Sequence, residues 1–207
     1  MKLSRKVLYA ILVVLIAGSY LHLTQQAEQE RIASTEQIIL NIEQKKQELV
    51  LKKELIAQLE REDRWMKEIG CLARNVYYEA RGESLQGQKA VALVTLNRVE
   101  SPMFPDTICG VVNERKKVAK RGVVCQFSWR CESHTNPKKH IKQSHESYQA
   151  AITAILDYDS LTQTLVTADT LFFHAAHVRP FWRKVKQRLA QIDNHIFYEQ
   201  RPGDKRR

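Results

Sequence analysis

The sequence predicts a mainly α-helical domain with a small β-hairpin or sheet (α+β), preceded by a transmembrane helix and a helical stalk. Three observations predict this order. Residues 7–23 are mostly apolar and carry no Asp, Glu, Lys or Arg, residues 25–66 contain neither Gly nor Pro, and residues 67–207 carry much of their apolar content at helical spacing. We therefore expect three parts, at residues 1–23, 24–66 and 67–207.

The composition excludes several classes of protein. Of the 207 residues, 43% are hydrophobic and 27% are charged, which excludes both a disordered chain and a polytopic membrane protein. The net charge is +10; residues 1–23 carry +3 and residues 24–66 carry −2, which leaves +9 for residues 67–207. A basic domain attracts polyanions, and nucleic acid, anionic lipid and an acidic cell-wall polymer all fit that description.

The amino-terminal part is expected to be a signal anchor. Lys2, Arg5 and Lys6 precede the apolar run, whose 17 residues lie at the short end of what spans a bilayer. A cleaved signal peptide is the alternative, since small residues occur within the run. The basic residues before the run and the acidic balance after it predict a cytoplasmic amino terminus. The expected location is the inner membrane, single-pass, with a periplasmic domain, or export if the signal is cleaved.

The second part of the chain predicts a helical stalk, because it is rich in Glu, Gln, Lys, Leu and Ile. Ile42, Leu49 and Ile56 recur every seven residues, which is the spacing of a coiled-coil seam, whereas Lys45 and Lys52 interrupt it. Two interpretations remain: a weak coiled coil that forms a homodimer, and a single solvated helical spacer.

All four cysteines, Cys71, Cys109, Cys125 and Cys131, lie in the carboxy-terminal part. An even number of cysteines in an exported domain predicts two disulfides. Cys125 and Cys131 would close a small loop, which leaves Cys71 to pair with Cys109. Buried free thiols are one alternative. Zinc binding is disfavoured, because no Cys-x-x-Cys occurs and a gap of five residues does not suit a zinc knuckle.

Within the domain, spacing and turn residues predict the elements in order. Gly82 ends a first helix with an apolar stripe, and Ser84 is a suitable N-cap for the second helix. The expected elements are helices at 65–81, 84–98, 108–114 and 144–158, a solvated basic loop at 115–121, a strand or hairpin at 123–129, and a strand at 164–174, followed by a mixed carboxy-terminal end.

The segment Tyr-Tyr-Glu-Ala-Arg-Gly-Glu at 77–83 contains the candidate for acid–base chemistry. Glu79 lies at the edge of the apolar face of the first helix. Burial there disfavours the charged carboxylate and raises its pKa, and Glu83, one turn further on, would act in the same direction. The alternative is an ordinary salt bridge with Arg81 or Arg98.

Several blocks of the sequence, in a fixed order, resemble the cell wall hydrolase family typified by the spore-cortex lytic enzymes (SleB-like). The resemblance covers roughly residues 67–200, about two thirds of the chain. The blocks are residues 71–99, 104–112, 125–129, 172–174 with Trp182, and 195–198. The resemblance implies a fold similar to the lysozyme-like lytic transglycosylases, cleavage of the glycan strand of peptidoglycan, and a catalytic acid at Glu79.

The resemblance also implies how one carboxyl group does the chemistry. Glu79 would protonate the glycosidic oxygen and then, as a carboxylate, take a proton from the C6 hydroxyl of the sugar, which leaves a 1,6-anhydro product. Glu83 is a poor second group for ordinary hydrolysis, because two carboxylates on one helical turn flank the same side of a sugar. The alternatives are a hydrolytic muramidase and a non-catalytic peptidoglycan-binding envelope tether. Nucleic-acid binding is supported by charge alone, and export counts against it.

Other residues offer amide, hydroxyl, carboxylate and aromatic groups that suit a sugar polymer. The substrate-binding candidates are Glu83, Gln126, Phe127, Ser128, Trp129, Phe173, His174 and Trp182. A core or hairpin role is the alternative for the aromatic ones. His174, His177 and His195 are not expected to bind a metal, because no His-Glu-x-x-His occurs, and no cofactor is expected.

The remaining basic segments are the loop at 115–121 and the tail at 205–207. They suit an anionic wall polymer or phospholipid, and simple solvation is the alternative. An endolysin of a phage and a host enzyme that remodels the wall both fit this sequence.

Overall fold

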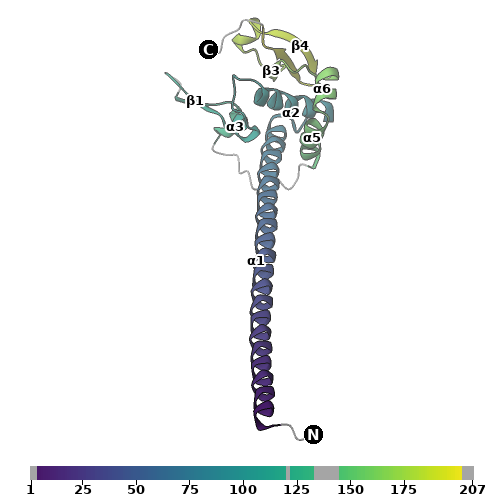
Figure 1. Cartoon of the computed structure of the whole chain (residues 1–207). Helices are drawn as coiled ribbons and strands as arrows, with labels where there is room; N and C mark the ends of the chain where they lie inside the picture. The colour runs from purple at the N-terminus through teal and green to yellow at the C-terminus, as the bar shows by residue number, and fades with distance from the viewer. Residues whose placement is uncertain (1–3, 120–121, 133–144, 202–207) are drawn as a thin grey trace. The chain divides into compact units, whose positions relative to one another are not determined.

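The computed structural model describes residues 4–119, 122–132 and 145–201, and it divides the chain into two compact units, Met1–Glu60 and Arg61–Arg207 (Figure 1). Helix α1 (Arg5–Ala80) extends through the first unit and into the second. The helices that the sequence predicts for the anchor, the stalk and the start of the domain form one continuous element, because no Pro occurs between residues 5 and 80.

The first unit is the amino-terminal portion of α1, and its described side chains are almost all exposed. Among the described residues, α1 is the helix that is long and apolar enough to cross a membrane; its most apolar window of 18 residues has a mean hydropathy of 2.0. This finding concerns length and composition, and the membrane anchor stays a prediction.

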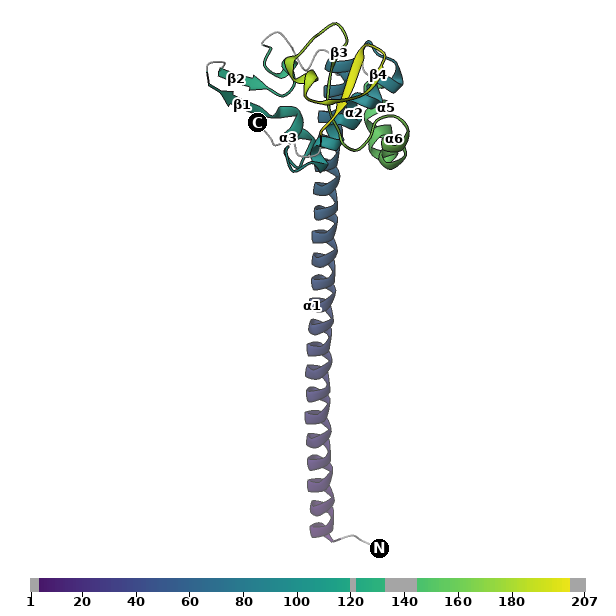
Figure 2. The same ribbon diagram turned by 90° about the horizontal axis from the view of Figure 1, so that it is seen from above.

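Helix α2 (Leu85–Glu100) carries the core of the second unit. Its N-cap is Ser84, as predicted, whose hydroxyl accepts a hydrogen bond from the amide of Gly87 at 3.2 Å. The helix packs against α3 (Ile108–Asn113), α5 (His145–Leu156), α6 (Tyr158–Thr164) and β3 (Thr170–Ala175), as the second view shows (Figure 2). Side chains buried to 1% exposure or less include Leu72, Val76, Val91, Leu93, Val94, Val111, Val112 and Phe197.

Two small antiparallel sheets complete the second unit. Strands β1 (Arg115–Val118) and β2 (Gly122–Cys125) form a hairpin, and η1 (Ser128–Arg130) follows it. Strands β3, β5 (His195–Glu199) and β4 (Gln187–Ile192) form the other sheet, in the order β3-β5-β4, with η3 (Phe181–Lys184) between β3 and β4 in sequence. The fold is therefore mainly helical with small sheets, which confirms the predicted class.

Three expectations about the elements are corrected. The basic segment from Arg115 was expected to be a solvated loop, but it is strand β1: its side chains are exposed, while its backbone pairs with β2. Lys120 and Arg121 lie outside the described residues. The strand expected at 123–129 ends at Cys125, and the strand expected at 164–174 begins only at Thr170. In both cases tertiary packing overrides the local preference for β structure.

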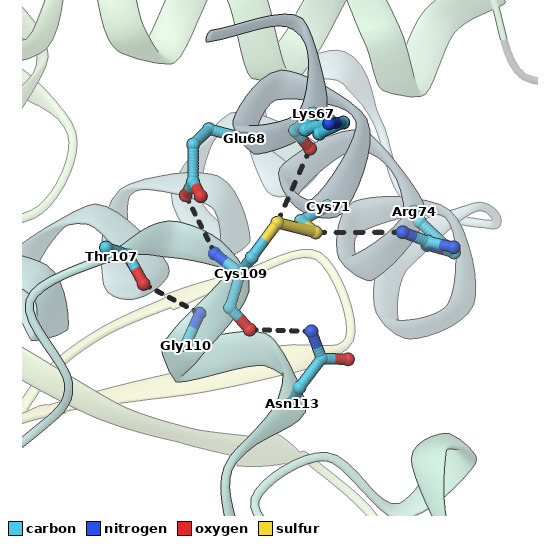
Figure 3. The surroundings of a disulfide bond; sticks show 8 residues. All are labelled: Lys67, Glu68, Cys71, Arg74, Thr107, Cys109, Gly110 and Asn113. Atoms are coloured by element: carbon cyan, nitrogen blue, oxygen red, sulfur yellow. Dashed lines mark hydrogen bonds between the residues drawn. A yellow bond between two sulfur atoms is a disulfide. The ribbon is translucent and has the colours of Figure 1, made fainter. Parts of the chain in front are cut away.

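The structure contains both disulfides in the predicted pairing. Cys71–Cys109 joins α1 to α3, with a Cα–Cα distance of 5.3 Å. Cys125–Cys131 closes the loop around η1, with a Cα–Cα distance of 5.7 Å. Figure 3 shows how the first bridge is supported: the amide of Cys109 donates a hydrogen bond to the Glu68 carboxylate at 2.8 Å. The end of α1 is thereby tied to the rest of the second unit.

Candidate active site

Glu79 lies in the last turn of α1, and its side chain is half-buried. Desolvation by burial raises the pKa of its carboxyl from 4.5 to about 7; the positive charge of Arg98 opposes this shift and the negative charge of Glu132 adds to it. None of the ion pairs among the described residues includes Glu79. Its surroundings therefore keep much of this carboxyl protonated near neutral pH.

Arg98, on α2, is a buried cation close enough to Glu79 to act on its charge. Its Nε donates a hydrogen bond to the carbonyl of Leu171 at 2.9 Å, and its guanidinium lies 5.2 Å from the ring centres of Phe104 and Phe127. Burial lowers the pKa of Arg98 to about 10, so the side chain stays charged at neutral pH. Because its partners fix it, Arg98 holds the positive charge at one place.

Gln126 connects Arg98 to a further carboxylate. With its amide oriented as its neighbours require, its oxygen accepts a hydrogen bond from Arg98 at 3.2 Å, and its nitrogen donates one to Glu114 at 3.3 Å. Among the predicted substrate-binding residues, Gln126 is thus engaged in the network next to Glu79.

Trp129, in η1, is buried, with 5% of its surface exposed. Its indole nitrogen donates a hydrogen bond to the Asn75 side chain at 3.1 Å, and its ring stacks on Tyr78 with the centres 4.5 Å apart. Phe127 is also buried, whereas Ser128 is exposed. Trp129 and Phe127 thus pack within the core, beside the residue that precedes Glu79.

Glu83 is placed differently from Glu79, although it follows it by one turn. Its two carboxylate oxygens accept hydrogen bonds from the backbone amide (2.9 Å) and the side chain (3.4 Å) of Asn194, and one of them lies 3.7 Å from Nδ1 of His195. Burial lowers the pKa of His195 and outweighs the opposing effect of Glu83. Glu83 therefore links the turn after α1 to the turn between β4 and β5.

The remaining predicted residues lie on the three-stranded sheet. Phe173 packs with Phe197 and His195 on one face, as alternation along a strand requires. His174 lies on the opposite face: its Nδ1 donates to the carbonyl of Ala175 at 2.9 Å, so its Nε2 accepts from the hydroxyl of Tyr198 at 3.0 Å.

Trp182 packs edge-on against both His174 and Tyr198, with each pair of ring centres 5.5 Å apart. The predicted residues thus divide into separate groups. Gln126 and Phe127 contact Arg98, and Trp129 contacts Tyr78, which precedes Glu79. Glu83 and Phe173 lie with the β4–β5 hairpin, and His174 packs with Trp182.

Sequence reasoning missed several residues of these groups, above all Glu132 and Asn194. The predicted second influence on the pKa of Glu79 was Glu83; the structure assigns that effect to Glu132, which follows η1. No sequence signal pointed to Glu132, because only the fold brings it near Glu79. Among the residues that the structure describes, no three His, Cys, Asp or Glu side chains converge to hold a metal ion.

The sequence model of the Cell Wall Hydrolase family matches residues 82–198, which is more than half of the chain. The match begins three residues after Glu79, includes α2 and the elements that follow it, and ends within β5.

Curated spore cortex-lytic enzymes are similar to this chain. The enzyme of Oceanobacillus iheyensis is 32% identical over 130 residues, which cover 63% of this chain and 41% of that protein. The enzyme of Bacillus subtilis is 30% identical over 132 residues, which cover 64% of this chain and 37% of that protein. The chain thus spans about two fifths of the length of the curated relatives that it matches.

Solved structures of two catalytic domains are also similar. The catalytic domain of the Bacillus cereus SleB protein has a TM-score of 0.48 and 28% sequence identity, and covers 65% of this chain and 91% of that one. The catalytic domain of the germination-specific lytic transglycosylase SleB from Bacillus anthracis has a TM-score of 0.47 and 27% identity, with 64% and 93% covered.

Proposed function

This chain belongs to the cell wall hydrolase family, and we propose that it cleaves the glycan strands of peptidoglycan as a membrane-anchored lytic transglycosylase. The observation that carries the proposal is the state of Glu79. A carboxyl group with a pKa of about 7 is close to evenly divided between acid and carboxylate at neutral pH, so it can both give and take a proton.

The proposed reaction uses Glu79 twice. Protonated Glu79 gives its proton to the glycosidic oxygen, and the C–O bond to the leaving sugar breaks as positive charge develops at C1. The Glu79 carboxylate then takes the proton of the C6 hydroxyl of the sugar that carries C1, and the C6 oxygen bonds to C1. The product is a 1,6-anhydro sugar, Glu79 is protonated again, and no water is consumed.

The position of Glu83 supports this scheme. Glu83 is already engaged by Asn194 and lies 3.7 Å from His195, so its oxygens are committed to the fold. Glu132 favours the competing reaction, hydrolysis. Hydrolysis needs a second carboxylate as the base that activates water, and Glu132 is close enough for its charge to act on Glu79. The nature of the product distinguishes the two reactions.

The test is digestion of purified peptidoglycan by the full chain in detergent micelles, with mass spectrometry of the soluble fragments. Transglycosylation gives fragments that lack one water relative to hydrolytic products. Glu79→Gln should reduce their release by about 10²–10⁴-fold, the usual contribution of a general acid. Glu146→Gln, which neutralises an exposed carboxylate on α5, is the matched control and should leave release unchanged.

Three results would contradict parts of this proposal. Fragments with a free reducing end would show hydrolysis. Loss of activity in Glu132→Gln would then identify Glu132 as the base that activates water. Full release by Glu79→Gln removes Glu79 from the chemistry. Binding to peptidoglycan without any release shows a wall-binding tether instead of an enzyme.

The proposal for the amino-terminal part is a single membrane span with the domain in the periplasm. It is supported by the apolar window within α1 and by the basic residues Arg5 and Lys6 before it. Protease added to spheroplasts should digest the domain and leave a membrane-bound fragment. A soluble, shortened periplasmic product would show a cleaved signal instead. The homodimer through the stalk stays a prediction, which cross-linking in the membrane tests.

A further inference from the structure

Three arginines, Arg74, Arg115 and Arg130, are brought together by a connected set of contacts in the second unit. Trp129 precedes Arg130 in the sequence, and Asn75 follows Arg74. The indole nitrogen of Trp129 donates a hydrogen bond to the side-chain oxygen of Asn75 at 3.1 Å. Arg115 stands opposite Cys125 in the β1–β2 pair, and the Cys125–Cys131 disulfide ends beside Arg130.

Arg115 also contacts the loop around η1 directly, because its Nη2 donates a hydrogen bond to the carbonyl of Arg130 at 3.3 Å. The cluster is therefore built from α1, β1 and η1, elements that are held by a disulfide, a strand pair and a buried hydrogen bond.

The three guanidinium groups have no acidic partner among the described residues, where none of the ion pairs includes them. Arg74 contacts a weak acceptor, since its Nη2 lies 3.7 Å from Sγ of Cys71 (Figure 3). Burial lowers the pKa of Arg130, and the positive charges of Arg74 and Arg115 lower it further. Within the described part of the chain, no carboxylate forms an ion pair that balances the repulsion within the cluster.

Arg130 has a further unmet requirement. Its Nε is buried and has no hydrogen-bond partner among the residues that the structure describes, while its guanidinium lies over the ring of Trp129 with 5.3 Å to the ring centre. A buried N–H without an acceptor is unfavourable, so a negatively charged acceptor that reaches this guanidinium would be bound favourably.

The chemistry of the cluster favours a carboxylate. A guanidinium offers two parallel N–H groups that match the two oxygens of a carboxylate. The stem peptides of peptidoglycan have carboxylates at their carboxy-terminal end and on side chains. Trp129 contacts both the ring of Tyr78 and the guanidinium of Arg130, so it connects the cluster to the residue that precedes Glu79.

We propose that Arg74, Arg115 and Arg130 form a binding site for a carboxylate of the peptidoglycan stem peptide, which holds the substrate while the glycan lies at Glu79. This inference rests on the proposed function, since it names which part of the same polymer the domain grips. It predicts that the domain distinguishes peptide-bearing wall with free carboxylates from the same wall with those charges removed.

The test measures binding of the full chain in detergent micelles to purified sacculi by sedimentation, in the Glu79→Gln background so that the wall is not consumed. One sample of sacculi is intact, and in the other the carboxylates are converted to amides with carbodiimide and methylamine. The parent chain should bind intact sacculi about tenfold more tightly than amidated sacculi, which is the scale of one charge-assisted pair. Arg74→Gln combined with Arg115→Gln should bind both samples equally weakly.

Two matched variants separate a site from general charge attraction. Lys117→Gln with Arg179→Gln also removes two positive charges, but from exposed positions outside the cluster. This pair should keep the parent chain's preference for intact over amidated sacculi. Arg74→Lys with Arg115→Lys keeps the charge and loses the planar fork, and should give an intermediate preference. Arg130 is left intact because it packs on Trp129, and tryptophan fluorescence should show that each variant is folded.

The proposal is overturned if the Arg-to-Gln pair binds intact sacculi as the parent does, if the control pair loses the preference equally, or if amidation has no effect. It is also overturned if the Arg-to-Gln pair loses binding only to phosphatidylglycerol vesicles, because the cluster would then contact membrane phosphate. Failure of the proposed function is distinguishable: it appears as absent fragment release by the unmodified chain, whereas this measurement uses a chain that does not cleave.

Discussion

Two carboxylates separated by one helical turn have opposite surroundings in this molecule. Glu79 is half-buried, belongs to no ion pair of the described residues, and has a pKa raised to about 7. The Glu83 side chain is only 9% exposed, yet it receives two hydrogen bonds from Asn194 beside the β4–β5 turn. The difference shows that burial alone does not decide what a carboxylate does. The oxygens of Glu83 are engaged by hydrogen-bond donors, whereas burial raises the pKa of Glu79.

This contrast divides the two residues between chemistry and stability. The region of Glu83 joins three elements: Asp193, at the adjacent turn, also accepts hydrogen bonds from the amide and hydroxyl of Ser84, at 2.9 and 2.6 Å. The region of Glu79 contains a fixed cation, Arg98, and a second acid, Glu132, which act on its charge in opposite directions. Glu83 thus supports the fold on which Glu79 depends.

The largest expected effect is a loss of stability between about pH 4.5 and 7. The pKa of Glu79 in the folded chain, about 7, is above the unfolded value of 4.5, so its contribution is fully present below about pH 4.5 and is lost as the pH rises through 7. Glu79→Gln carries no titrating group, so its free energy of unfolding relative to the parent should rise by about 3 kcal/mol between pH 4 and pH 8. Urea unfolding at both pH values measures the free energy of unfolding of the two chains. If it changed equally with pH in both, Glu79 would not have the raised pKa that distinguishes it from Glu83.

The second effect is a loss of stability at Glu83. Glu83→Ala removes the acceptor of two Asn194 hydrogen bonds and leaves the buried Nδ1 of His195 without the nearby carboxylate. The free energy of unfolding should fall by about 2 kcal/mol. Glu83→Gln keeps one acceptor oxygen and should lose less. Thermal unfolding of the three chains gives the order, and a fully stable Glu83→Ala would show that this carboxylate is not structural.

The smallest effect concerns the pH dependence of cleavage. Because the acid form of Glu79 starts the reaction, activity should fall as the pH rises through about 7. The negative charge of Glu132 raises the pKa of Glu79, so Glu132→Gln should move this fall to lower pH. Rates of fragment release across the pH range measure the shift. A fall of activity at higher pH in Glu132→Gln, or an equal displacement in Glu146→Gln, would reject the effect of Glu132 on the pKa of Glu79.

Local patterns were sufficient for much of the fold. The absence of Gly and Pro predicted the long helical region, Ser84 predicted the start of α2, and the count and spacing of cysteines predicted both disulfides. The sheets were harder. Strand β1 reads as a charged loop because its side chains are exposed and its pairing with β2 depends on the backbone. The β4–β5 hairpin had no clear alternation that identified it beforehand.

The sequence by itself determined the helical architecture, the cysteine pairing and the candidacy of Glu79, because these depend on residues close in the chain or on a small set of combinations. Only the tertiary structure decided which carboxylate is satisfied, which cation is buried beside Glu79, and which arginines meet around Trp129. The physical reason is that a carboxylate's charge state depends on donors and charges within a few ångströms. Residues as distant in sequence as Glu83 and Asn194 reach that distance only when the chain has folded.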